Sequence, residues 1–66
     1  MIKVNDFPVP FNEGITLLDV LNKASVDING PVLVTVNGIF VGSGSYGSTI
    51  LKDEDEVLAM RVVSGG

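Results

Sequence analysis

At the start of the chain, the apolar residues Ile2 and Val4 alternate with polar neighbours. A period of two is typical of a strand with one buried face. Asn5-Asp6 supplies turn residues, and a second alternating segment follows it. Pro8 and Pro10 in that segment cannot donate hydrogen bonds to a ladder, which favours an edge position. The pattern predicts an N-terminal hairpin whose second strand is outermost.

The spacing of apolar residues then changes from two to that of a helix. One stripe is formed by four residues, Leu17, Val20, Leu21 and Ala24. Thr16 is suited to cap the helix N-terminus. Asp19 in the first turn and Lys23 in the last turn complement the helix dipole. We therefore predict one short helix, followed by a loop over residues 25–31 that is rich in turn formers.

The second half of the chain is rich in strand formers. Residues 32–36 and 39–41 flank Asn37-Gly38, the strongest short signal for a two-residue hairpin turn. Residues 42–49 are small and predict a flexible surface loop, and residues 52–55 predict a turn. Residues 57–63 are apolar on both faces, which suits a central strand.

This order of elements predicts an α+β protein with a β-grasp architecture. We expect a mixed five-stranded sheet with one main helix packed on one face. The β-grasp domain should span residues 1–63, and a flexible C-terminal tail should span 64–66, because Ser64, Gly65 and Gly66 have little side chain to pack.

The last strand offers two faces to a partner or to the helix. We expect the helix to pack against the residues at even positions, Leu58, Met60 and Val62. An open apolar face with a cationic rim would then be formed by Ala59, Arg61 and Val63, with Phe40 or Leu33 nearby. Exposed apolar faces often mark protein interfaces, so this is the candidate docking face. The apolar character of residues 32–36 on both faces leaves the register open.

Composition narrows the classes of function. The 66 residues include no Cys and no His, so the chain can form no disulfide, thiol nucleophile or imidazole base. A core of this size leaves little room for a catalytic pocket of roughly 300–1,000 Å³. We expect a protein that is not an enzyme, binds no metal and carries no cofactor of its own.

The net charge of −4 disfavours nucleic-acid binding, which needs clustered Lys and Arg. The N-terminus lacks a signal-peptide pattern, and no apolar run approaches the length of a membrane span. We expect a soluble cytoplasmic protein that is a monomer when free.

Two motifs have functional and structural interpretations. Gly42, Gly44 and Gly47 match G-x-G-x-x-G, but residues 48–52 are too short and β-like to supply the helix that dinucleotide binding requires. The acidic run at residues 53–56 lacks the spacing of a calcium loop. A surface loop and a solvated turn are the favoured interpretations, with docking of a basic partner as the alternative for the acidic run.

The C-terminal tail carries the candidate chemistry. Extended residues 63–66 would reach on the order of 13 Å at about 3.3 Å per residue, enough to enter a narrow channel in a partner. The glycines would not obstruct the channel, and the terminal carboxylate can be activated as an acyl-adenylate and then exchanged for sulfur. The alternative is an inert chain end.

The whole chain resembles the ubiquitin-like sulfur carriers, closest to the ThiS family of the thiamine pathway. The resemblance rests on five segments in order: Met1-Ile2-Lys3-Val4-Asn5, Gly14-Ile15-Thr16-Leu17, Val34-Thr35-Val36-Asn37-Gly38, Leu51-Lys52-Asp53 with Asp55-Glu56-Val57, and Gly65-Gly66. The segment from Gly42 to Gly47 departs from the Pro-Arg and Trp pattern of many members. The tail also looks like that of the molybdopterin-synthase small subunit (MoaD).

The resemblance implies that Gly66 bears the sulfur and that Gly65 keeps the tail unobstructed. It implies a ThiF-like adenylating enzyme that uses ATP, a cysteine-derived sulfur donor, and a ThiG-like thiazole synthase as acceptor. Sulfur transfer to molybdopterin or another pathway stays open, as do a ubiquitin-like modifier and a plain interaction module.

Overall fold

The computed structural model describes residues 1–62. Val63 and the tail predicted for residues 64–66 lie outside the described residues. Within the described part, the elements in chain order are β1 (Ile2–Val4), β2 (Phe7–Val9), α1 (Leu17–Lys23), β3 (Val32–Val36), β4 (Ile39–Val41), the 3₁₀ helix η1 (Ser43–Ser48) and β5 (Glu56–Arg61).

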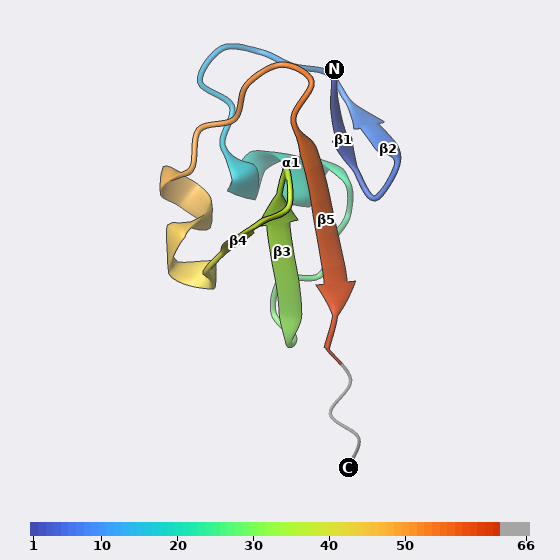
Figure 1. The fold of residues 1–66 in the computed structure, drawn as a ribbon, viewed down its shortest axis with the longest axis vertical. Coiled ribbons are helices and arrows are strands. Elements are labelled where there is room, and N and C mark those ends of the chain that lie inside the picture. Colours follow the sequence, from blue (N-terminus) through green and yellow to red (C-terminus); the bar gives the residue numbers. More distant parts are fainter. Residues whose placement is uncertain (63–66) are drawn as a thin grey trace.

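The five strands form one mixed sheet in the order β2-β1-β5-β3-β4 (Figure 1). β5 lies in the centre, parallel to β1 and antiparallel to β3. β2 is an edge strand, and Pro8 therefore deprives no neighbouring strand of a hydrogen bond. The predictions of an outermost second strand, a central last strand and a β-grasp sheet are confirmed.

Both hairpins turn through residues with positive φ. Asn5 and Asp6 have φ of 49° and 68°, and Asn37 and Gly38 have φ of 51° and 84°. Two-residue turns of this kind match the right-handed twist of the strands they join. Asn, Asp and Gly adopt this conformation more readily than other residues, which explains why the chain reverses at these two positions.

α1 begins at a capping box. The backbone N–H of Asp19 donates to Thr16 Oγ1 (3.2 Å), and the backbone N–H of Thr16 donates to Asp19 Oδ2 (3.1 Å). The hydrogen bonds from the Thr16 backbone and side chain hold the pKa of Asp19 below its ordinary value. The predicted cap is confirmed, and the helix starts where the sequence placed it.

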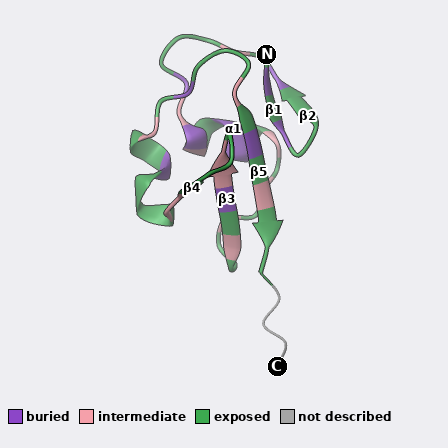
Figure 2. Cartoon of the chain, in the orientation of Figure 1, coloured by how far each residue is buried: buried purple, intermediate pink, exposed green. Residues whose placement is uncertain are grey.

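The helix covers one face of the sheet, and the core lies between them (Figure 2). Three helix residues, Leu17, Val20 and Leu21, are fully buried there. The buried sheet residues come from four strands and are Ile2, Val4, Val9, Val34 and Val57.

The segment predicted as a flexible loop is an ordered 3₁₀ helix, η1. Tyr46 is only 4% exposed and joins the core cluster, and η1 packs against α1. Thr49 Oγ1 donates to the carbonyl oxygen of Ser45 (2.7 Å) and closes the last turn. The aromatic ring gives this small-residue segment enough buried surface to become ordered. A single Tyr among glycines and serines was the signal in the sequence.

No helix in the part of the chain that the structure describes is both long enough and apolar enough to cross a membrane.

Candidate functional site: the end of the central strand and the open sheet face

The candidate site begins where β5 ends. The backbone N–H of Val62 donates to the carbonyl oxygen of Pro31, the residue before β3 (2.9 Å), so the chain is bonded to its neighbour in the sheet up to its last described residue. β5 ends beside the beginning of β3, where Arg61 pairs with Val32 (Figure 1). We call residues 58–62 the stem. The predicted site residues Ser64, Gly65 and Gly66 follow it and lie outside the described residues.

The prediction of which β5 residues face the helix is wrong. Val57 is 1% exposed and faces the helix, whereas Leu58 and Met60 are 51% and 55% exposed on the other face. The pairing of Val34 with Ala59 also puts Ala59 on the helix side, because directly paired residues share a face. The reason is that Val36 pairs with Val57, and this non-local register fixes which β5 residues the helix covers.

The open face carries exposed apolar residues from three neighbouring strands. The register pairs Leu33 with Met60, and Thr35 with both Leu58 and Phe40. We define the apolar sheet patch as four residues, Leu33, Phe40, Leu58 and Met60, which are between 40% and 60% exposed. Of the residues predicted for docking, Phe40 and Leu33 lie on this face. Ala59 and Arg61 lie on the opposite side of β5, and Val63 is outside the described residues.

Ala59 and Arg61 instead line a shallow hollow of about 370 Å³ on the helix side of the stem. The other walls come largely from the loop between α1 and β3, including Asp27 and Pro31. The cationic rim expected from Arg61 is therefore not part of the open face. The open face does carry two oppositely charged residues, Lys3 and Glu56, which are paired across β1 and β5.

Little in the sequence of β5 indicates which of its residues face the helix. β5 has one charged residue at each parity, Glu56 and Arg61, so charge does not distinguish its faces. Leu58 and Met60 are as apolar as the residues that the helix covers. Only knowledge of which β3 residue pairs with Val57 could have shown that Leu58 and Met60 lie on the open face.

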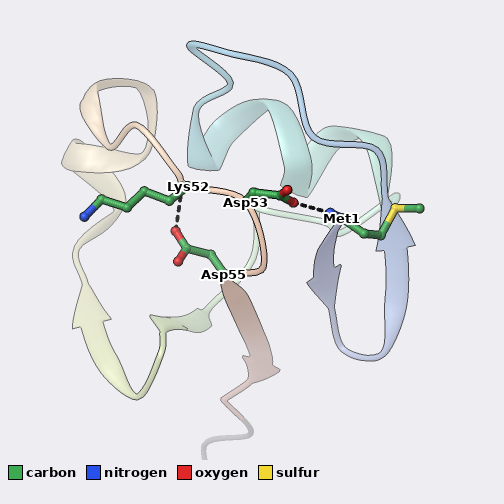
Figure 3. A network of polar contacts seen from close by, with 4 residues as sticks. All are labelled: Met1, Lys52, Asp53 and Asp55. Atoms are coloured by element: carbon green, nitrogen blue, oxygen red, sulfur yellow. Dashed lines mark hydrogen bonds and ion pairs between the residues drawn. The ribbon is translucent and has the colours of Figure 1, made fainter.

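The acidic run lies at the opposite end of β5 from the tail (Figure 3). The Asp53 carboxylate accepts a hydrogen bond from the amino group of Met1 and forms an ion pair with it. This contact raises the pKa of the Met1 amino group and lowers the pKa of Asp53. Asp55 accepts from the Lys52 backbone N–H (2.8 Å). Two of the four acids thus hold the turn, which gives the run a structural role.

Residues 1–62 contain no cluster of three Asp or Glu side chains placed to hold a metal ion. In that part of the chain every buried side-chain nitrogen and oxygen has a hydrogen-bond partner.

The chain was compared with known proteins. The model of the ThiS family matches residues 2–66. A crystal structure of the thiamine biosynthesis protein ThiS from Geobacter metallireducens superposes with a TM-score of 0.78 and is 25% identical, covering 98% of this chain and 97% of the other. An NMR solution structure of a thiamine biosynthesis protein from the same organism superposes with a TM-score of 0.70, also at 25% identity, covering 98% and 86%.

No curated protein matches the chain. The family match runs over nearly the whole sequence and includes the terminal glycines, and both solved structures superpose on nearly the whole chain. The chain belongs to the ThiS family.

Proposed function

We propose that this chain is a sulfur carrier of thiamine biosynthesis and that the carboxylate of Gly66 carries the sulfur. A ThiF-like partner would transfer AMP from ATP to the carboxylate and release pyrophosphate. Sulfur at the sulfide level, supplied by a cysteine-derived donor, would then attack the acyl carbon. A C–S bond would form as the C–O bond to AMP breaks, which releases AMP and leaves a thiocarboxylate. A ThiG-like thiazole synthase would take that sulfur into the thiazole ring.

The observation that carries the proposal is the family match, which includes the terminal glycines. ThiS-family membership supports the broader function, and the adenylation and thiocarboxylate steps are our inference from the tail. ATP and the catalytic side chains belong to the partners, since the chain has neither Cys nor His. The chain therefore acts as a substrate of its partner enzymes.

The apolar sheet patch is the surface that we propose for docking the activating enzyme. It replaces the docking face predicted from the sequence, and Phe40 and Leu33 are common to both. Leu58 and Met60 lie on the stem itself, so a partner that covers the patch would hold the strand from which the tail emerges. Partly exposed apolar side chains of this kind gain most from burial at an interface.

The test is a mass spectrum after incubation with a ThiF-like enzyme, ATP and a sulfur donor. Replacement of one carboxylate oxygen by sulfur adds nominally the same mass as oxidation of Met1 or Met60, so the gain must be placed on the fragment that contains Gly66. We expect an ATP-dependent gain there and none in a chain that lacks Gly66. A plain carboxylate after treatment with several activating enzymes would contradict the proposal. High-mass conjugates ending at Gly66 would favour a protein modifier.

A further inference from the structure

The central strand is longer than one of its neighbours. The ladder between β1 and β5 ends where Val4 pairs with Val57, whereas β5 continues to Arg61. On the other side of β5, the pairing with β3 extends from Val57 to Arg61, and Arg61 is paired with Val32. Figure 1 shows β5 running on past the hairpin of β1 and β2. The stem therefore has a main-chain ladder on one side only.

The side chain of Asn5 occupies the missing ladder position. Its Nδ2 donates to the carbonyl oxygen of Ala59 (2.9 Å), and the backbone N–H of Ala59 donates to its Oδ1 (2.9 Å). A primary amide offers the same donor and acceptor as a peptide group. The backbone N–H of Asn5 meanwhile donates to the carbonyl oxygen of Val57 (3.0 Å), before the chain turns away at a φ of 49°. A turn residue thus extends the ladder into the stem.

We infer that Asn5 is a positioning residue for the tail and for the apolar sheet patch. This inference rests on the proposed function, because it concerns how the tail reaches an activating enzyme. Ala59 lies between Leu58 and Met60, so the amide of Asn5 holds the strand segment that presents both of these patch residues. Among residues 1–62, the other hydrogen bonds of the stem go to β3 and Pro31. Loss of the Asn5 amide would therefore let residues 58–62 move more freely, and more entropy would be lost when a partner orders this segment.

The other turn asparagine provides a matched control. Asn37 Nδ2 donates to Asp55 Oδ1 (2.9 Å), and the backbone N–H of Glu56 donates to Asn37 Oδ1 (3.0 Å). Asn37 therefore also bonds β5 through its side chain, from a two-residue turn with positive φ. It does so at the beginning of the strand, away from the stem. The two residues are alike in turn conformation and in making two side-chain hydrogen bonds, but Asn5 bonds the backbone of Ala59 alone, whereas Asn37 bonds the Glu56 N–H and the Asp55 carboxylate at the other end of β5.

The experiment compares Asn5→Gly with Asn37→Gly in ATP-dependent activation by a ThiF-like enzyme. Glycine accepts positive φ, so both turns keep their backbone while each loses its amide. Assays are run at a temperature where circular dichroism shows both variants folded. We expect Asn5→Gly to raise KM roughly threefold to tenfold with kcat nearly unchanged, the size expected for one net hydrogen bond. The KM of Asn37→Gly should stay within about twofold of the KM of the unmodified chain.

Asn5→Asp provides a second, nearly isosteric variant. Its carboxylate can still accept from the Ala59 N–H but cannot donate to the Ala59 carbonyl group. We expect a raised KM here as well, and faster hydrogen exchange at the amides of the stem. If Asn5→Gly does not fold, Asn5→Asp takes its place in the comparison with Asn37→Gly.

Equal KM values for the Asn5 and Asn37 variants, or unchanged exchange in the stem, would overturn the positioning role while leaving the proposed function intact. If the unmodified chain is not activated at all, the proposed function fails and the positioning role fails with it.

Discussion

The two faces of the central sheet are built from similar side chains but have different surroundings. On β5, Val57 is 1% exposed beneath the helix, and the next residue, Leu58, is 51% exposed on the other side. The helix face is closed by α1, while the open face keeps the apolar sheet patch at its surface. A domain of this size has one helix to cover one face, so an apolar second face is available to a partner. The buried residues under the helix stabilise the fold, whereas we propose that the exposed residues of the apolar sheet patch bind the activating enzyme.

The helix-covered face should give the largest effect on folding. Replacing fully buried Leu21 by Ala removes apolar contacts and leaves a cavity, which typically lowers the free energy of unfolding by about 2–5 kcal/mol. For so small a domain, this is a large share of its stability. Urea denaturation followed by circular dichroism measures the change. A loss as small as that of an exposed residue would contradict the packing described for α1.

The open face should give the opposite result. Leu58→Glu places a charge in the apolar sheet patch, and we expect kcat/KM for activation to fall by tenfold or more, equivalent to about 1.4 kcal/mol. The free energy of unfolding should change by less than about 0.5 kcal/mol, as for most surface substitutions. Ile50→Glu is the control, because Ile50 is 66% exposed and belongs to no part of the patch. Equal activity of the two variants would remove the patch from the docking surface.

The helix cap separates the two faces of the sheet, because it should affect the stability of the helix-covered face and not docking on the open face. Thr16→Ala removes the side chain that accepts from the Asp19 backbone N–H, and such caps typically contribute about 1 kcal/mol. We expect a lower midpoint in thermal unfolding with unchanged KM for activation in the folded protein. Thr16→Ser, which keeps the hydroxyl group, should restore most of the stability. A raised KM for Thr16→Ala under conditions where the variant is fully folded would mean that α1 influences docking directly.

The smallest effect concerns pH at the end of the sheet far from the tail. The Met1 amino group lowers the pKa of Asp53, so this carboxylate stabilises the fold above its ordinary pKa of 3.8, and that stability is lost as the pH falls through the lowered value. The raised pKa of the Met1 amino group gives a contribution that is present below 8.0 and is lost as the pH rises through the raised value. Both groups are exposed, so the changes should be small.

Asp53→Asn should flatten both limbs of the pH profile of unfolding, measured by thermal denaturation. Glu54→Asn is the control. Within residues 1–62 the ion pair of the Met1 amino group is with Asp53, and the charge of Glu54 is the smallest of the causes that raise the pKa of that amino group, so this variant should flatten the alkaline limb much less. A profile that keeps its shape in Asp53→Asn would show that the ion pair contributes nothing measurable. Activation by the partner should be the same in both variants at neutral pH.

The sequence by itself determined the local elements. Asn37-Gly38 marked one hairpin, Pro8 marked an edge strand, and Thr16 marked the start of the helix. Each of these signals acts through the conformation of one residue or of its immediate neighbours, and such signals can be read from a short stretch of sequence. The spacing of apolar residues added the helix stripe, and the order of elements added the β-grasp sheet.

Only the tertiary structure decided which side of β5 the helix covers, and the prediction from sequence chose the wrong side. The choice depends on the pairing of Val57 with Val36, and a shift of one residue exchanges the faces of the whole strand. The burial of Tyr46 likewise depends on a distant partner, the helix. So does the bond from Asn5 to Ala59, which joins residues 54 positions apart. These features follow from contacts between remote segments, which periodicity along the chain does not encode.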